Sequence, residues 1–122
     1  MKKPAKVSST RPAKWTSLLD PKQVRQAFEE AVVDCYGDYE QHTGLLTMIE
    51  DEVTFPFEVS VLGETVQVVK MDWPDDDTFG LDLVCERNGS RYRIDARSVD
   101  LLPPFPNGHL YLAAYLEWRK HL

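Results

Sequence analysis

Acidic side chains dominate one part of the chain, and they are residues that could hold a metal cation. Between Arg25 and Lys70 there is no lysine or arginine, whereas ten carboxylates occur there. They are Glu29, Glu30, Asp34, Asp38, Glu40, Glu50, Asp51, Glu52, Glu58 and Glu64. Carboxylate oxygens are the ligands of hard cations, and Ca²⁺ accepts roughly six to eight of them in an irregular geometry. The pattern therefore predicts a cation site, with an acidic face neutralised only by water as the alternative.

The spacing of these acids is unfavourable unless something neutralises them. Glu30, Asp34 and Asp38 stand four residues apart. On a helix this spacing stacks like charges along one edge, at a cost of about 0.2–0.5 kcal/mol per pair. Asp38 and Glu40 fall where that helix is expected to end, beside the negative end of its dipole. Both the like-charge spacing and the acids at a negative helix end are unfavourable, and such departures from local preferences are typical of a functional site.

An acidic triplet, residues 50–52, follows on the next element. The candidate metal ligands are Asp34, Asp38, Glu40, Glu50, Asp51 and Glu52. Ca²⁺ is the expected ion, because Mg²⁺ requires a tight octahedron and keeps much of its water. Zinc would prefer His or Cys ligands, and among the histidines only His42 lies near.

A second acidic stretch lies between two predicted strands. Asp75, Asp77, Gly80 and Glu86 occupy the first, third, sixth and twelfth positions of an EF-hand loop. Phe79 stands at the fifth position, where an oxygen ligand belongs, and no helical pattern flanks the loop. We interpret this stretch as an acid-rich hairpin loop with a coincidental spacing and, at most, weak affinity for Ca²⁺.

The acids must be positioned by the surrounding elements, of which the first is a helix. Asp20-Pro21 predicts its start, as an N-cap followed by proline at the first helical position. Apolar residues then recur at helical spacing, at Val24, Phe28, Ala31, Val32, Cys35 and Tyr39. We expect this helix to end between Gly37 and His42, with Gly44 as a C-terminal stop.

Residues 45–53 suit either a short helix or an extended segment. Beyond Phe55 the hydrophobic period changes to two, which indicates strands. Tight hairpins are predicted at Gly63-Glu64 and at Asn88-Gly89. Consecutive antiparallel strands, about four or five here, favour a small β-barrel or a curled sheet.

A closing helix is expected from Asn107 or Gly108 onward. The fold class is therefore α+β: an N-terminal helix with a short acidic segment, the antiparallel strands, and a C-terminal helix. Residues 1–20 contain five bases and one acid, whereas the whole chain of 122 residues carries a net charge of −6. We expect residues 1–19 to form a disordered basic arm and residues 20–122 to form one acidic domain.

The composition also excludes several classes of protein. The apolar runs are far shorter than the ~20 residues that span a bilayer, so a membrane protein is not expected and we predict a cytoplasmic one. The acidic domain argues against nucleic acid as a partner, because phosphate binding needs a basic surface. Cys35 and Cys85 lie far apart, form no metal motif and are expected to be buried thiols. A monomer is expected.

The segment VVDCYGDYEQHTGLLTMIEDEVTFPFEVSVLGETVQVV resembles the small calcium-binding proteins without EF-hands first described from cyanobacteria, a family also found in other bacteria. The matching positions are Asp34, Tyr36, Glu40, Gly44, Glu50, Asp51 and the Phe55-Pro56-Phe57 junction. A downstream GLDLVCERNGSRYRI hairpin is also similar, so the resemblance spans roughly residues 27–118. The chain departs from the pattern after Gly44, where LLTM replaces the aromatic residues that the family tends to carry.

The resemblance implies a Ca²⁺ buffer or sensor that binds the ion through acidic side chains and has no catalytic activity. Asp34, Glu40 and Asp51 carry over by motif position, and the other three candidate ligands are included because they are acidic and nearby.

Two rival functions remain. The first is a small β-barrel interaction module without metal, in which Trp73, Phe79 and Tyr92 beside an arginine-bearing hairpin dock a protein or peptide partner. The arginines concerned are Arg87, Arg91, Arg93 and Arg97. The same arginines could instead neutralise the acidic helix within the fold. The second rival is a thiol enzyme built on Cys35 and His42, but no third group is evident to orient the histidine, so we do not expect an enzyme.

Overall fold

The computed structural model describes residues 15–74 and 79–122. The Asp75–Asp77 part of the EF-hand-like loop lies outside them. The helical elements are η2 (Trp15–Leu18), α1 (Pro21–Ala31), α2 (Asp38–Glu52), η3 (Ala96–Ser98) and α3 (His109–Lys120). The strands are β1 (Phe57–Val61), β2 (Glu64–Asp72), β3 (Asp82–Arg87), β4 (Ser90–Asp95) and β5 (Asp100–Leu101). The expected α+β class is confirmed.

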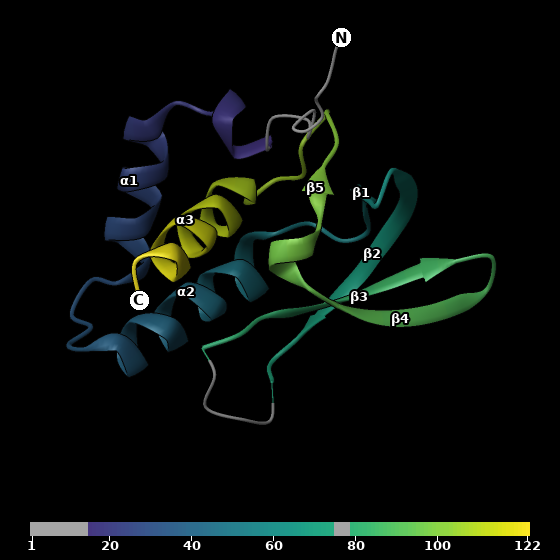
Figure 1. Cartoon of the computed structure of the whole chain (residues 1–122). Coiled ribbons are helices and arrows are strands. Elements are labelled where there is room, and N and C mark those ends of the chain that lie inside the picture. Colours follow the sequence, from purple (N-terminus) through teal and green to yellow (C-terminus); the bar gives the residue numbers. More distant parts are fainter. Residues whose placement is uncertain (1–14, 75–78) are drawn as a thin grey trace, which may run out of the picture.

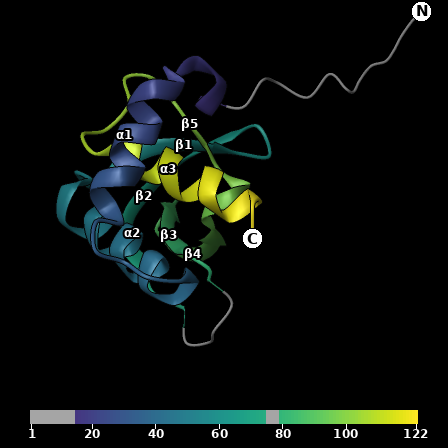
Figure 2. The ribbon, with the colours of Figure 1, turned by 90° about the vertical axis from the view of Figure 1, so that its left-hand side faces the viewer.

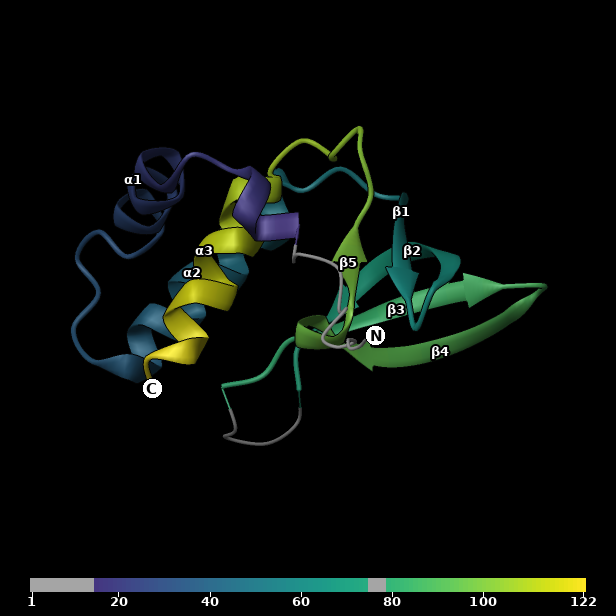
Figure 3. The ribbon, with the colours of Figure 1, turned by 45° about the horizontal axis from the view of Figure 1, so that its top comes forward.

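The helices and the strands occupy separate sides of the molecule. In Figure 1, α1, α2 and α3 lie together on the left and the sheet lies on the right. Figure 2, seen from the helical side, places the three helices in front of the strands, and Figure 3 shows the same division after a different rotation. The core lies between them, where fully buried side chains of α2 (Leu45, Ile49) and α3 (Tyr115) join those of the strands (Val59, Val68).

The sheet is antiparallel and open. Its strand order is β4-β3-β2-β1-β5, so β4 and β5 are edges and the barrel form expected as one alternative is not realised. Closure would require β4 to pair with β5, but β5 has only two residues, which pair with β1. The β4 edge carries Arg91 and Arg93, and such charges discourage pairing with another chain. Both predicted hairpins form, and Asn88-Gly89 has the positive φ pair of a type I′ turn, as expected. The first turn lies at Leu62-Gly63, one residue earlier than the predicted Gly63-Glu64, because Glu64 already pairs with Val61.

The first helix is shorter than predicted. α1 ends at Ala31 and a new helix begins at Asp38, so the expectation of one helix reaching Gly37–His42 is wrong. The chain turns sharply between them, with φ of +60° at Asp34 and +88° at Gly37. These left-handed conformations interrupt the helix although the apolar spacing continues across them.

Gly44, expected to stop the first helix, lies inside α2 instead. A Cβ atom at this position would stand 2.4 Å from the carbonyl oxygen of Ala31, so the glycine is required for the close approach of α1 and α2. The ambiguous residues 45–53 form the C-terminal half of α2.

The two ends of the chain also contribute to the fold. Residues 15–18, assigned above to the disordered arm, form η2, and Trp15 is only 4% exposed. Its ring packs 5.6 Å from that of Phe105, so the ordered domain begins earlier than residue 20. The final helix begins after Gly108, as expected. Within the described ranges, no helix combines the length and the apolar character needed to cross a membrane.

Candidate metal site

The six candidate ligands fall into two groups at opposite ends of α2. The N-terminal acidic group comprises Asp34 of the α1–α2 connector with Asp38 and Glu40 of the first turn of α2. The C-terminal acidic group comprises residues 50–52 in the last turn. At ~1.5 Å per residue, Asp38 and Glu50 are about 18 Å apart along the helix axis. One ion therefore cannot contact both groups.

The N-terminal acidic group lies in a favourable position. Asp38 and Glu40 stand at the start of a helix, where the dipole is positive, and the prediction that they oppose a negative helix end is wrong. Glu40 also organises the connector, because its Oε1 accepts a hydrogen bond of 2.8 Å from the backbone N–H of Tyr36. Gly37, the N-cap, supplies no side-chain cap of its own. The carboxylate of Glu40 thus holds the chain where it reverses between the two helices.

The C-terminal acidic group has the opposite electrostatic setting. Residues 50–52 are exposed and stand at the negative end of the α2 dipole, with no basic residue in the last turn. Such a placement destabilises the helix end unless a cation is nearby. The unfavourable dipole effect expected from the sequence therefore occurs here and not at Asp38.

Glu30 does not join the N-terminal acidic group. It lies in the last turn of α1, where its Oε1 accepts a hydrogen bond of 2.9 Å from the hydroxyl of Tyr111 on α3. Burial raises the pKa of the Tyr111 phenol above its usual value, and the hydrogen bond to Glu30 and the charges of Glu30 and Glu52 raise it further. Glu30 therefore ties α1 to α3, and the predicted stack of Glu30, Asp34 and Asp38 does not form.

The arginines of the strands do not neutralise the acidic helices, contrary to one expectation above. Arg87 pairs with Glu64, Arg91 with Glu86, Arg93 with Asp72 and Asp82, and Arg97 with Asp95. Of the ten acids between Arg25 and Lys70, Glu64 alone forms an ion pair with a described residue. The remaining nine are neutralised by no base of the described part of the chain.

These unpaired acids are not gathered around a common centre. Among the residues that the structure describes, no three or more His, Cys, Asp or Glu side chains lie together in a way that could hold a metal ion. The N-terminal acidic group would need the connector to move its side chains together. An irregular connector is a suitable place for Ca²⁺, because this ion tolerates irregular geometry and accepts backbone carbonyls as ligands.

His42 and Cys35 do not form a catalytic pair. His42 is buried, and its Nε2 lies 2.8 Å from the carbonyl oxygen of Gly80, while its ring stacks on that of Trp118 at 5.9 Å. The thiol of Cys35 lies 4.0 Å from the carbonyl oxygen of Ala31. Both side chains thus serve contacts between elements, and His42 is not placed as a zinc ligand.

The predicted interaction surface is only partly present. Tyr92 on β4 and Trp73 are exposed. The ring of Phe79, in contrast, packs against the rings of Tyr39, His42 and Trp118. The four arginines expected on this surface already form ion pairs with carboxylates of neighbouring residues. These arginines are therefore not free to receive an acidic peptide.

The order of elements and the open antiparallel sheet define an α+β fold that solved proteins share, which confirms the fold implied by the sequence resemblance. One of them is Anabaena CcbP, which is 19% identical to this chain, with a TM-score of 0.64 over 82% of this chain and 90% of that one. Another is a calcium-binding protein in its calcium-binding form, with 19% identity and a TM-score of 0.63 over 84% of this chain and 92% of that one. No protein-family model matches the chain, and no curated protein matches it in sequence. At this identity the likeness establishes the fold.

Proposed function

We propose that the protein is a non-catalytic Ca²⁺-binding protein whose ligands come from the acidic groups that flank α2. One observation carries the proposal: nine carboxylates between Arg25 and Lys70 have no partner among the described bases. The likeness of the fold to that of a protein described as calcium-binding supports it.

The N-terminal acidic group is the first proposed site. Asp34 and Asp38 flank a connector whose backbone carbonyls are additional oxygen ligands of the kind that Ca²⁺ accepts. Glu40 already accepts a hydrogen bond from the backbone N–H of Tyr36 in the connector. A carboxylate that accepts one hydrogen bond still has lone pairs with which it can bind a metal. An ion at this position would fix the turn that joins α1 to α2.

The C-terminal acidic group is the second proposed site, with Asp51 as its central ligand. A cation at this position would neutralise three adjacent carboxylates together with the negative end of the α2 dipole. At both positions the ion acts by removing repulsion, so its binding free energy stabilises the folded chain. The stabilisation amounts to about 2.7 kcal/mol when the free ion is one hundred-fold above its dissociation constant.

The test is the melting temperature of chelator-stripped protein with and without millimolar Ca²⁺, and with Mg²⁺ as the control ion. A rise of about 10 °C is expected at that saturation for a chain of this length. The Asp34→Asn/Asp51→Asn variant should lose this rise. The matched control Glu29→Gln/Glu58→Gln, which removes two other exposed and unpaired charges, should keep it.

Each outcome has a distinct meaning. An unchanged Ca²⁺ response in Asp34→Asn/Asp51→Asn would overturn the assignment of the site but not the function. The absence of any Ca²⁺-specific rise in the wild-type protein would overturn the function. Amide resonances recorded in the same titration separate a buffer from a sensor, because a sensor requires shifts that extend beyond α2 and its connector.

A further inference from the structure

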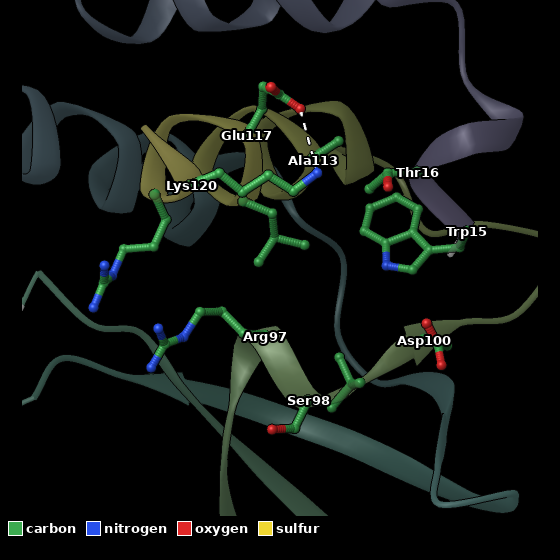
Figure 4. Close-up of a pocket in the computed structure, with 11 residues that line it drawn as sticks. Trp15, Thr16, Arg97, Ser98, Asp100, Ala113, Glu117 and Lys120 are labelled. Atoms are coloured by element: carbon green, nitrogen blue, oxygen red, sulfur yellow. Dashed lines mark ion pairs between the residues drawn. The ribbon is translucent and has the colours of Figure 1, made fainter. Parts of the chain in front are cut away.

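A cavity of about 190 Å³ opens between η2, the segment from η3 to β5, and the C-terminal half of α3. It shares no residue with the two acidic groups. One wall is apolar and contains Trp15, Val99 and Leu116. Figure 4 shows the indole of Trp15 on one side of this space and the side chain of Arg97 on the other. The cavity therefore has an apolar end and a cationic end.

Three cations line the cavity, although the protein as a whole is acidic. Arg119 and Lys120 come from α3, and Arg97 comes from η3. Of the two acids in the lining, Glu117 is paired with Lys120 and His121, and Asp100 lies on the Trp15 side in Figure 4. The two arginines therefore have no counter-ion from the lining of the cavity itself.

Arg97 is held rigidly. Its Nε donates to Oδ1 of Asp95 at 3.1 Å and its Nη2 donates to Oδ2 at 2.9 Å, which fixes the plane of the guanidinium. A guanidinium has about five N–H donors, so the pairing leaves others for a ligand. Because Asp95 lies outside the lining, it orients Arg97 from behind.

Arg119 lacks the partners that Arg97 has. It forms no ion pair with any carboxylate in the described ranges, and its Nε is buried without a hydrogen-bond partner. Arg97 and Arg119 line the same cavity. The pKa of Asp95 is lowered chiefly by the hydrogen bond from Arg97, and the charge of Arg119 lowers it as well. The charges of two arginines thus act on one carboxylate, and a second anion in the cavity would balance them.

We propose that this cavity binds a small organic anion, with its carboxylate or phosphate group on Arg97 and Arg119 and its apolar part against Trp15. The size fits such a ligand, since an apolar cavity of about 150 Å³ accommodates benzene. Arginine is suited to the head group because its planar donors match both carboxylate and phosphate oxygens. Arg119 and Lys120 are favourable at the C-terminal end of α3 because the helix dipole is negative there. This dipole does not explain the presence of Arg97, which belongs to η3.

The test is an NMR titration of Ca²⁺-free protein with four probes: benzoate, phenyl phosphate, inorganic phosphate and phenol. Benzoate or phenyl phosphate should bind saturably, with shifts at the backbone amides of Trp15, Arg97 and Arg119. The tighter of the two identifies the head group. Inorganic phosphate should bind at least about tenfold more weakly, because it lacks the apolar part, and phenol likewise, because it lacks the charge.

Two variants and a control assign the binding to this cavity. Arg119→Gln should weaken binding by about tenfold or more, whereas Arg91→Gln, which removes one exposed arginine on β4, should change it less than about twofold. Leu116→Trp enlarges a side chain of the apolar wall while keeping all three cations, and should abolish binding even if Arg119→Gln fails to fold. Equal binding of phenol and benzoate, equal losses in the two arginine variants, or no saturable shift with any probe would each overturn the proposal.

Discussion

Replacing Gly108 by alanine should damage the contact between the start of α3 and the end of α2. Gly108 has φ +81° and precedes α3 as its N-cap. A Cβ atom there would stand 2.5 Å from the carbonyl oxygen of Glu52 and 2.7 Å from the backbone nitrogen of Val53. Both neighbours are backbone atoms, so neither can move away by changing a rotamer. The segments are further joined by a hydrogen bond from the N–H of Thr54 to the carbonyl oxygen of Asn107 at 3.2 Å.

The expected loss has two parts that a control variant separates. Alanine in the left-handed region costs about 1–2 kcal/mol, and the reduced entropy of the unfolded chain offsets about 0.4–1 kcal/mol of this. Gly89 has nearly the same φ, +79°, but nothing lies within 4 Å of its Cβ position. Gly89→Ala should therefore cost only the conformational part, about 1 kcal/mol. Gly108→Ala should cost about 1–3 kcal/mol more, because forcing atoms into a packed site displaces the backbone.

Urea unfolding of the two variants and the wild-type protein measures this difference. With a slope of about 1.5 kcal/mol per molar urea, the midpoint of Gly108→Ala should lie about 0.7–2 M below that of Gly89→Ala. Equal midpoints would show that α2 and α3 can separate freely at this point. The inference that the close approach of Gly108 to the backbone of Glu52 and Val53 requires a glycine would then be wrong.

Two further predictions concern buried or paired titratable groups. Burial raises the pKa of Tyr115 to about 12, so its contribution to stability is complete below pH ~10 and is lost as pH rises toward ~12. In Tyr115→Phe the loss of stability at alkaline pH should disappear. The variant should also have a free energy of unfolding at pH 7 that is lower by about 1–3 kcal/mol, because the carbonyl of Phe79 loses its hydrogen bond. If calorimetry shows the same dependence of stability on alkaline pH in the variant and the wild-type protein, the prediction is wrong. Asp95 has a lowered pKa, chiefly through the hydrogen bond from Arg97, so its stabilising effect is present above pH ~4 and disappears as pH falls further. The stability gap between the wild-type protein and Asp95→Asn should therefore be larger at pH 6 than at pH 2.5 in urea titrations, and a constant gap would refute the ion pair.

Local signals in the sequence predicted the starts and turns of the elements well. Asp20 accepts a hydrogen bond from the N–H of Lys22, as an N-cap should, and Asn88-Gly89 forms the expected hairpin. The break after Ala31 was missed because the apolar spacing continues through it. A signal for a new helix was nevertheless present, since a glycine at position 37 precedes acids in what becomes a first turn.

The partners of the charged groups could not be predicted from the sequence, because the register of the sheet determines them. Arg91 lies directly across from Glu86 in the β3–β4 pairing, which is a favourable position for opposite charges. Arg93 reaches Asp82 on the same strand pair. The sequence shows the ten acids and a group of arginines, and only the fold shows that they meet at a single pair, Arg87 with Glu64.

The length of α2 also determines how two bound ions would influence each other. At physiological ionic strength the Debye length is about 8 Å, less than half of the ~18 Å that separates the two acidic groups along the helix. Much of the direct repulsion between two divalent ions at these positions would therefore be screened by the solvent. Two ions bound in this way would titrate as nearly independent sites, with a Hill coefficient near 1, and any steeper curve would have to come from a movement of α2 itself.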